Sequence, residues 1–254
     1  MPQQKTRKSA IRKFLSMLKR QIRKFRHKKE IKKCVSRVNY FLPCIPIDYQ
    51  LLKSQCNYFY AEELPHLRRK VERLFVFHEI PGNILIGNSL TYTNNHLDVI
   101  DKIHSCRIDQ NRKIILPVSY GWGNAFGGDP NELISQSGLN PDTTVWLTSY
   151  LDREVYFGLF NNVTHAVFGV LRQQALGNIF ECLRKGVKVY LYKDSIVAKQ
   201  LKDDGIIFYT IDEDLTEESL CSCLSKEEAL HNFKVMKKMD IDTSEAVFRV
   251  LSGK

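Results

Sequence analysis

The residues best suited to chemistry lie between Arg172 and Asn178, where a β-branched run ends and an amphipathic segment begins. Because the N-terminus of a helix carries unpaired N–H groups and a partial positive charge, such a turn is a natural seat for a phosphate. An ordinary loop of solvated polar side chains is the alternative. The stretch holds one guanidinium, three side-chain amides and a glycine that lets the backbone come close to a ligand: Arg172, Gln173, Gln174, Asn178 and Gly177.

Three other loops that follow predicted strands are also rich in polar and small residues. Capping of the next helix explains one or two of the residues in the first loop, where Thr93 or Asn94 suits the N-cap, but it does not explain all of them. In the second loop, residues 119–124, glycines accompany aromatic rings that could stack on a base or sugar, and a structural role is favoured for the third loop, residues 149–152. The residues singled out in these loops are Gly87, Asn88, Ser89, Thr93, Asn94, Asn95, Tyr120 and Tyr150.

Two residues near these loops could serve as a catalytic base. They are His96 and Asp152, but a histidine on a helix face is more often structural, and we assign the role to neither. The sequence has no GxGxxG motif and no Walker lysine, so a typical dinucleotide-binding fold and a P-loop NTPase are both unsupported.

Strands and helices alternate through the region that positions these loops. This alternation predicts βαβ crossovers and a six-stranded, mostly parallel sheet over residues 83–212, covered by helices on both faces. Ligands of such α/β, Rossmann-like sheets bind beyond the carboxyl ends of the strands, where the polar loops lie. The β-rich runs are 83–87, 113–118, 144–149, 165–170, 187–192 and 206–210, and the helical candidates are 95–106, 131–138, 152–161, 176–185, 195–203 and 216–238.

The chain is predicted to have three parts: a basic arm (1–33), a lead-in segment packed on the main domain (34–82) and the main domain with a C-terminal helix (83–254). Within the lead-in we expect a short strand at Val35–Phe41 and helices at Asp48–Gln55 and Glu62–Leu74. Composition supports a globular protein, since 43% of the 254 residues are hydrophobic and 26% are charged.

Positive charge is concentrated in the arm. The whole chain carries a net charge of +10, and the arm holds fourteen Lys and Arg residues against the single acid Glu30. Apolar residues at helical spacing form one narrow face between Ile11 and Phe25, as in a helix that lies on an anionic membrane surface. A nucleic-acid-binding tail and a disordered basic tail are the alternatives, and nucleic acid is disfavoured because it has no need of the apolar face.

Compartment and metal content can also be predicted. No apolar run approaches the roughly 20 residues of a membrane span, and the N-terminus is too charged for a secretory signal. Seven cysteines without a paired framework favour a reducing compartment. The Cys221-x-Cys223 pair lacks a second ligand pair, so we expect no metal. The predicted location is the cytoplasm, peripheral on the inner face of the cell membrane.

Three segments resemble a known enzyme family: ILIGNSLTYTNNHLDV (84–99), KIILPVSYG (113–121) and HAVFGVLRQQALGNIFECLRKGVKVYL (165–191). They are similar to the nucleotide-binding half of the bacterial 4-acetamido-4,6-dideoxygalactosyltransferases (TDP-Fuc4NAc:lipid II transferases). The resemblance covers about residues 83–212, and its most specific parts are GNS…TNNH and RQQ…G.

The resemblance implies a GT-B architecture of which this chain has the C-terminal, donor-binding half. It further implies a dTDP-sugar donor, an undecaprenyl-diphosphate glycan acceptor, inversion at the anomeric carbon and no cofactor or metal. The donor diphosphate would be lined by Gly87, Asn88, Ser89, Thr93, Asn94, Asn95, Arg172, Gln173, Gln174, Gly177 and Asn178, with Arg172 stabilising the leaving group. The basic arm would hold the enzyme at the membrane that carries its acceptor.

One departure from the family concerns the half that normally contacts the acceptor and supplies the base. Only about 50 residues separate the arm from the donor domain, whereas a whole Rossmann domain has roughly a hundred or more. The expectation is therefore either a divergent glycosyltransferase, with a partner protein supplying the acceptor half, or a truncated, non-catalytic module that binds a nucleotide-sugar or nucleic acid.

Overall fold

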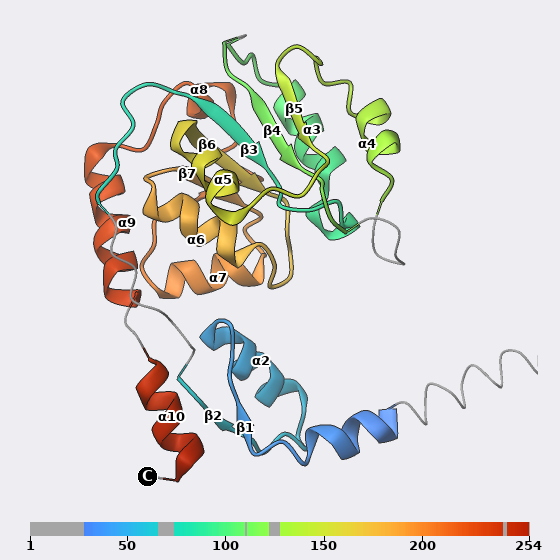
Figure 1. Ribbon diagram of the computed structural model, residues 1–254, viewed down its shortest axis with the longest axis vertical. Coiled ribbons are helices and arrows are strands. Elements are labelled where there is room, and N and C mark those ends of the chain that lie inside the picture. The colour runs from blue at the N-terminus through green and yellow to red at the C-terminus, as the bar shows by residue number, and fades with distance from the viewer. Residues whose placement is uncertain (1–27, 66–73, 110, 122–127, 241–242, 254) are drawn as a thin grey trace, which may run out of the picture. The chain divides into compact units, whose positions relative to one another are not determined.

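The computed structural model describes residues 28–65, 74–109, 111–121, 128–240 and 243–253 (Figure 1). The chain forms two compact units, residues 1–67 with 243–254 and residues 68–242. The interfacial helix predicted for residues 8–26 lies outside the described residues. No helix in the described ranges is long and apolar enough to cross a membrane.

The first unit is small and has an aromatic centre. Residues 28–35 are helical, and the chain continues through β1 (Tyr40–Phe41), α2 (Pro46–Gln55) and β2 (Glu62–Glu63), with α10 (Ser244–Ser252) at the other end of the sequence. Strands β1 and β2 pair in parallel. The rings of Phe41 and Phe59 pack edge to face at 5.5 Å between centroids, and the Tyr49 hydroxyl donates to the Ala61 carbonyl at 3.0 Å.

Two local predictions in this unit were wrong in part. The strand expected at Val35–Phe41 is limited to Tyr40–Phe41, and residues 28–35 are helical. The helix expected from Glu62 begins instead as strand β2, because Glu62 and Leu64 donate backbone N–H groups to the carbonyls of Asn39 and Phe41. The helix predicted at Asp48–Gln55 is confirmed as α2, with Pro46 at its first position, where a missing N–H costs nothing.

The second unit contains the predicted six-stranded parallel sheet, which is confirmed. Its strand order is β5-β4-β3-β6-β7-β8, and every neighbouring pair is parallel. This is the order 3-2-1-4-5-6 of a Rossmann fold. The strands are β3 (Asn83–Ile86), β4 (Ile114–Pro117), β5 (Thr144–Leu147), β6 (Val163–Phe168), β7 (Lys188–Leu191) and β8 (Tyr209–Thr210).

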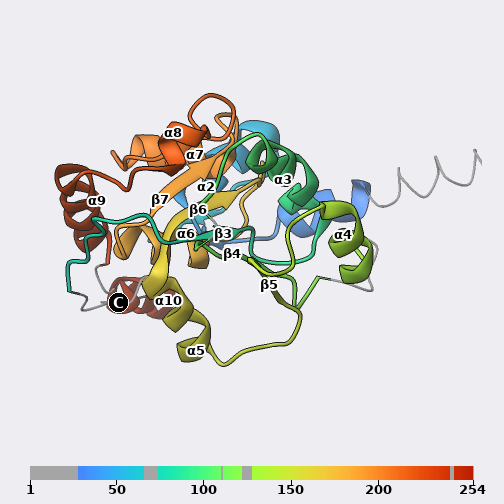
Figure 2. The same cartoon turned by 90° about the horizontal axis from the view of Figure 1, so that it is seen from above.

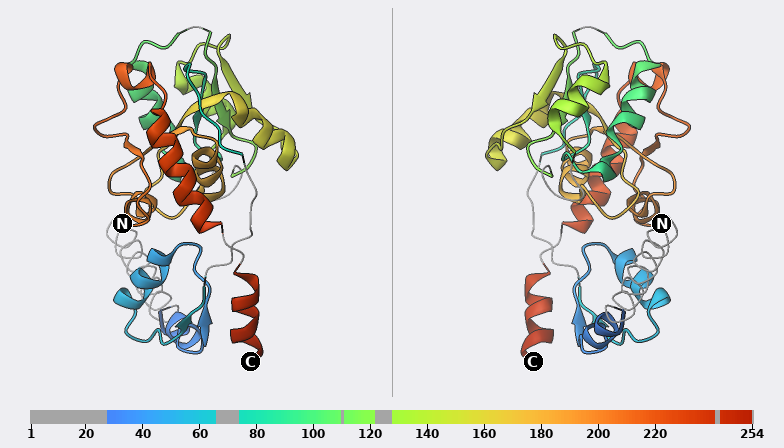
Figure 3. Two further views of the ribbon diagram at one scale, coloured as in Figure 1. Left: turned by 90° about the vertical axis from the view of Figure 1, so that its left-hand side faces the viewer. Right: turned by 90° about the vertical axis from the view of Figure 1, so that its right-hand side faces the viewer.

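Helices cover both faces of this sheet, so every residue of its four central strands except Asn83 is buried. On one face, Leu85 and Phe168 pack with side chains of α6 (Leu176–Arg184), α7 (Ile196–Asp203) and α9 (Lys226–Met239). On the other, Ile84 and Ile86 pack with α3 (His96–His104), α4 (Pro130–Ser137) and α8 (Glu217–Leu220). Figure 2 shows α3 and α5 (Arg153–Gly158) on opposite sides of the strands, and the left panel of Figure 3 shows α9 along the sheet.

Alternation of side chains along each strand explains this arrangement. Leu85 belongs to the core on the α6 side, while Ile84 and Ile86 belong to the core on the α3 side, as the period of two in a strand requires. Helix α6 buries Ile179, Cys182 and Leu183 at the i, i+3, i+4 spacing of an amphipathic helix. The region predicted as one helix at 216–238 is divided into α8 and α9, and α9 begins with a capping box formed by Ser225 and Glu228.

The last part of the predicted lead-in packs within the second unit. The His78 Nε2 atom lies 2.9 Å from the Lys185 carbonyl oxygen, and the rings of Phe75 and Phe233 meet edge to face at 5.5 Å. The predicted boundaries at residues 33 and 82, and the packing of residues 34–65 on the main domain, stay predictions.

Two buried cations lie at the edge of the sheet where the strands begin. Arg112 donates to the carbonyls of Gly82 at 2.5 Å and Leu220 at 2.6 Å, and its third contact is the His165 ring at 2.9 Å. Lys188 donates to the carbonyls of Ser219 at 2.9 Å and Ser222 at 3.2 Å. These backbone oxygens provide the hydrogen bonds that a buried charge requires, and they tie residues 219–222 to the sheet.

Candidate functional site

A crevice at the topological switch point of the sheet is the candidate site. From β3 the chain moves outward through β4 and β5, and β6 then returns to the opposite side of β3. The loops that follow β3 and β6 therefore lead to helices on different faces, and ligands of open α/β sheets bind where such loops separate; we call this place the crevice. These are the loops that begin at Gly87 and Gly169.

Hydrogen bonds between side chains join the two loops. From the second loop, Gln174 accepts from the Thr93 hydroxyl at 2.6 Å through Oε1 and donates to Thr91 Oγ1 at 2.9 Å through Nε2. Arg172 donates to Gln174 Oε1 at 3.2 Å and to Thr93 Oγ1 at 3.4 Å. The side chain of Arg172 is exposed, and these partners are neutral, so they leave its positive charge uncompensated. The network therefore ties the guanidinium of Arg172 to side chains of both loops.

Backbone packing brings the same two loops together below this network. Asn95, in the left-handed conformation with φ of 49°, donates through Nδ2 to the Gly169 carbonyl at 2.6 Å. A Cβ atom on Gly169 would lie 2.5 Å from the Asn94 carbonyl oxygen. Only glycine fits at position 169 while the loops keep this separation, because real Cβ contacts are never so short.

Within the first loop, four of the predicted site residues are buried: Gly87, Asn88, Ser89 and Asn94. Asn94 is fully buried, and its Nδ2 donates to the Ser89 carbonyl at 2.8 Å and to Ser89 Oγ at 2.9 Å. Its Oδ1 accepts from the Asn88 N–H at 3.3 Å. Asn94 and Ser89 therefore hold the shape of the loop and do not face the crevice. The N-cap predicted at Thr93 or Asn94 is wrong, since Asn95 occupies that position.

The start of α6 forms the other wall of the crevice. Its N-cap, Ala175, has φ of 60°, a strained conformation for a residue with a Cβ atom. Gly177 is exposed, and a Cβ atom placed there would have nothing within 4 Å. The first N–H groups of the helix precede its first internal hydrogen bond, from Ile179 N–H to the Ala175 carbonyl, and are available to an anion. Gln173 is partly exposed in the same loop.

A cavity of about 250 Å³ adjoins the crevice. Asn88 lies in its wall and joins it to the network, because its Nδ2 donates to the Tyr120 hydroxyl at 2.7 Å and its Oδ1 accepts from Gln174 at 3.5 Å. The amide of Asn178 donates to the Tyr156 hydroxyl at 2.7 Å. Tyr150, which is 81% exposed, lies at its rim. The aromatic residues predicted after β4 and β5 thus lie beside the crevice, although residues 122–127 fall outside the described part of the chain.

The two candidate bases have different surroundings. His96 is 6% exposed, and burial lowers its pKa to about 4, so its ring is neutral at pH 7. A Cβ atom on Gly87, which has φ of 67°, would lie 2.7 Å from His96 Nε2. Asp152 is exposed at the N-cap of α5 and makes no side-chain capping hydrogen bond. No hydrogen bond or ion pair joins the Asp152 carboxylate or the His96 imidazole to Arg172, and the catalytic base stays unassigned.

Two residues of the site were missed by sequence reasoning. Thr91 receives hydrogen bonds from Gln174 and from Asn94 at 3.0 Å, so it is central to the contact between the loops. Its position within a run of hydroxyl residues was the available signal. Gly169 was also missed, although a glycine directly after a buried strand indicates close backbone approach. In the described ranges, no group of three or more His, Cys, Asp or Glu side chains could hold a metal ion.

The strand order, with two loops that meet at its switch point, defines a Rossmann-like α/β unit. The family model of 4-alpha-L-fucosyltransferases, glycosyl transferase group 56, matches residues 49–235 of the chain. The chain belongs to this family. The match confirms the predicted resemblance at the level of a glycosyltransferase family, and the particular donor and acceptor stay predictions.

Three solved structures show similarity in fold at low sequence identity. AviGT4, a glycosyltransferase involved in avilamycin A biosynthesis, is 12% identical with a TM-score of 0.48, over 76% of this chain and 59% of that one. The α,α-trehalose 6-phosphate synthase of Burkholderia multivorans is 11% identical with a TM-score of 0.49, over 68% and 43%. The glycosyltransferase SnogD of Streptomyces nogalater is 15% identical with a TM-score of 0.45, over 85% and 57%. In each case the aligned region is about half the length of the solved protein.

Proposed function

We propose that the protein is a hexosyltransferase that moves an acetamido-deoxyhexose from a dTDP-sugar to a lipid-linked glycan acceptor, with inversion, in cell-surface polysaccharide synthesis. Family membership supports the transfer of a 6-deoxyhexose. The single observation that carries the donor site is the network of Arg172, Gln174, Thr93 and Thr91 across the switch point.

The network suits the chemistry of a nucleoside diphosphate leaving group. As the bond between the anomeric carbon and the β-phosphate oxygen breaks, negative charge grows on the phosphate. Arg172 and the first N–H groups of α6 can stabilise that charge without a metal, because they are positively polarised and already aimed at the crevice. Gln174 holds the guanidinium, and Gly177 leaves the helix start uncovered. The adjoining cavity with Tyr120 and Tyr150 would take the base or the sugar.

A nucleotide-binding experiment tests this donor site. In calorimetric titrations with dTDP and UDP, Arg172→Ala should weaken binding roughly ten- to a hundredfold, since a charge-assisted hydrogen bond contributes about 1.5 to 3 kcal/mol. Arg172→Lys should restore only part of the affinity, because an ammonium lacks the planar fork. The matched control is Arg107→Ala, which removes an exposed charge after the C-terminus of α3, at the other edge of the sheet. Equal affinities in all four proteins would reject the site.

A transfer assay tests the activity itself. Membranes containing the protein should move label from a dTDP-deoxyhexose to extractable lipid, and Arg172→Ala should abolish the transfer. Nucleotide binding without any transfer over a panel of dTDP- and UDP-sugars would favour the non-catalytic nucleotide-sugar-binding module instead. Restoration of transfer by a second protein would identify the partner that supplies the acceptor half.

We also propose that the basic arm places the enzyme on the inner face of the cytoplasmic membrane. Residues 28–33, the described end of the arm, lie in an almost fully exposed helix that continues to residue 35. This helix carries the exposed apolar Ile31 and four lysines: Lys28, Lys29, Lys32 and Lys33. Lysines near anionic lipid contribute about 1 kcal/mol each. In flotation assays the protein should bind anionic vesicles and ignore neutral ones, and deletion of residues 1–33 should remove the binding. Equal recovery with both vesicles would contradict this.

A further inference from the structure

A second cavity, of about 270 Å³, lies between the N-terminal end of α3 and one side of α4. Because both helices follow strands of the parallel sheet, their N-termini face the same edge as the crevice. The cavity shares Thr91 with the network described above, since Thr91 lines its wall and accepts from Gln174. Residues of the loop after β3 thus separate the two spaces. The lining includes Leu90, Thr91, Tyr92, His96, Glu132 and Gln136.

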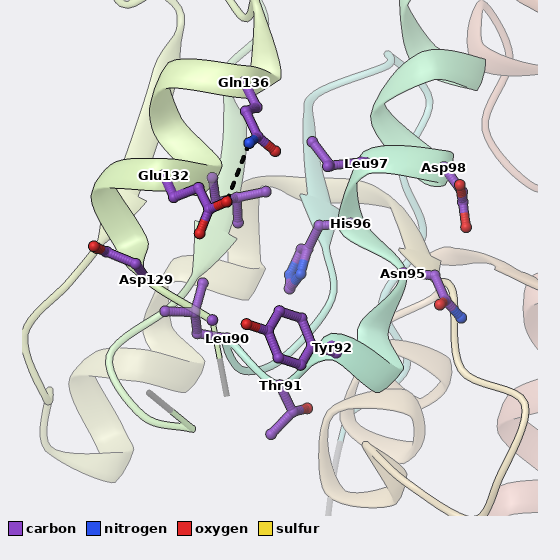
Figure 4. Close-up of a pocket in the computed structure, with 12 residues that line it drawn as sticks. Leu90, Thr91, Tyr92, Asn95, His96, Leu97, Asp98, Asp129, Glu132 and Gln136 are labelled. Atoms are coloured by element: carbon purple, nitrogen blue, oxygen red, sulfur yellow. Dashed lines mark hydrogen bonds between the residues drawn. The ribbon is translucent and has the colours of Figure 1, made fainter. Parts of the chain in front are cut away.

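The polar groups of this cavity converge on one space. Figure 4 shows the side chains of Glu132, Gln136, Tyr92 and His96 directed toward it, while Asn95 and Asp98 point away. Gln136 donates to one oxygen of Glu132 at 3.2 Å, and the other oxygen keeps its capacity to accept. Tyr92 is 65% exposed and offers a ring face and a hydroxyl. Leucine side chains make up much of the remaining wall, so the cavity combines apolar surface with a few oriented polar groups.

The charge of the lining disfavours a phosphate. The carboxylate of Glu132 is directed into the space, whereas Asp98 points away and Asp129 caps α4. None of the described lining residues is a lysine or arginine. An anionic group would meet repulsion here, whereas hydroxyl groups can donate hydrogen bonds to a carboxylate. The volume is below the roughly 300 to 1,000 Å³ typical of drug-sized ligands, which suits one sugar ring better than a whole nucleotide-sugar.

A buried histidine ring forms part of the cavity wall. Among the described residues, His96 Nε2 is buried without a hydrogen-bond partner, and the residue is 6% exposed. Its ring projects from the start of α3 into the space between Leu90 and Glu132 (Figure 4). Nε2 itself lies against Gly87, where a Cβ atom would be 2.7 Å away, so the ring forms an inner wall of the cavity and its environment reports whether the cavity is occupied.

We propose that this cavity binds an uncharged hexose ring, with Glu132 and Tyr92 as the residues that select it. The inference rests on the proposed transfer function and adds a sugar subsite beside the diphosphate crevice. The ring can come from two sources, the transferred sugar of the donor or the terminal sugar of the acceptor glycan. In both cases the crevice holds the diphosphate and the second cavity holds a neutral ring.

Binding measurements with four probes test the subsite: dTDP, dTDP-glucose, methyl β-glucoside and methyl N-acetyl-β-glucosaminide. They are titrated into wild type, Glu132→Ala, Tyr92→Phe and the control Glu227→Ala, which removes an exposed first-turn glutamate of α9. NMR of the His96 ring reports occupation of the cavity directly. If the donor sugar enters, dTDP-glucose should bind more tightly than dTDP, and both site variants should lower that advantage roughly three- to tenfold. If the acceptor sugar enters, the methyl glycosides should shift the His96 signal, and their affinity should fall by the same factor in both site variants.

The two proposals fail in different ways. Unchanged binding of every sugar-bearing probe in Glu132→Ala and Tyr92→Phe, with a silent His96 signal, would overturn the subsite, and dTDP binding that depends on Arg172 would still support the donor crevice. Loss of dTDP affinity in the site variants would also overturn it, because the cavity would then belong to the nucleotide. Binding of a methyl glycoside without any binding of dTDP would keep the subsite and reject the donor crevice.

Discussion

The substitution Gly169→Ala tests whether the two crevice loops depend on direct backbone contact. Its new Cβ atom would lie 2.5 Å from the Asn94 carbonyl oxygen and 2.8 Å from Val99 Cγ2. Both neighbours are fully buried and cannot move aside easily. Overpacking of this kind costs about 1 to 3 kcal/mol, and weakening the 2.6 Å hydrogen bond from Asn95 to the Gly169 carbonyl adds about 1 kcal/mol. We expect a loss of about 2 to 4 kcal/mol in the free energy of unfolding.

Urea denaturation measures this loss, and titration with dTDP measures its effect on the crevice. The matched control is Gly158→Ala, since Gly158 has helical φ and ψ of −62° and −35° and a Cβ atom there would have nothing within 4 Å. That control should be neutral or slightly stabilising. An unfolding free energy of Gly169→Ala within about 0.5 kcal/mol of wild type would refute the reasoning, because surface substitutions give changes of that size. Unchanged dTDP affinity in a destabilised variant would show that the contact serves folding alone.

Three further predictions concern single residues. Burial lowers the pKa of His96 from 6.5 to about 4, so the unfolded chain binds a proton at a higher pH than the folded one. The free energy of unfolding should therefore not depend on His96 above pH 6.5 and should fall by about 3 kcal/mol as the pH drops toward 4. In urea denaturation, His96→Gln should flatten the dependence of the midpoint on pH over this range. Gly177→Ala should leave thermal stability unchanged or raise it, since the position is helical and open, yet weaken dTDP binding, and equal affinity would show that no phosphate approaches this backbone. Ala175→Gly should raise the unfolding free energy by about 1 kcal/mol, because glycine adopts the positive φ of this position without the steric cost of a Cβ atom. An unchanged urea midpoint would show that Ala175 is not strained.

Periodicity in the sequence was enough to predict the sheet, because continuous apolar runs such as that of Val163–Phe168 occur where both faces of a parallel strand are covered. Strand order was not predictable in this way. Nothing in the local pattern says that β6 returns to β3, and this pairing places the loops after Gly87 and Gly169 at one crevice. The sequence therefore indicated which loops carry polar groups, and the pairing of β6 with β3 shows which two of them act together.

Residue roles within the loops were predictable only in part. Thr93, Asn94 and Asn95 are alike in polarity, yet Asn94 is fully buried as a loop scaffold and Asn95 spans to Gly169. Such differences depend on tertiary contacts, which polarity and spacing do not encode. Glu132 and Tyr92 were missed as a possible sugar site for the same reason. From the sequence, Glu132 in the first turn of a helix indicates only a favourable interaction with the helix dipole. The cavity beside it is visible only in the structure.

The buried cations at the opposite edge of the sheet have a consequence for synthesis of the chain. Arg112 and Lys188 find hydrogen-bond acceptors in the backbone between residues 219 and 222, which the ribosome makes long after the strands that carry these cations. A nascent chain that ends before residue 219 would have to bury both charges without those acceptors, which is unfavourable. Closure of the sheet therefore has to await emergence of this short segment from the exit tunnel. Until then the nascent domain should remain sensitive to protease.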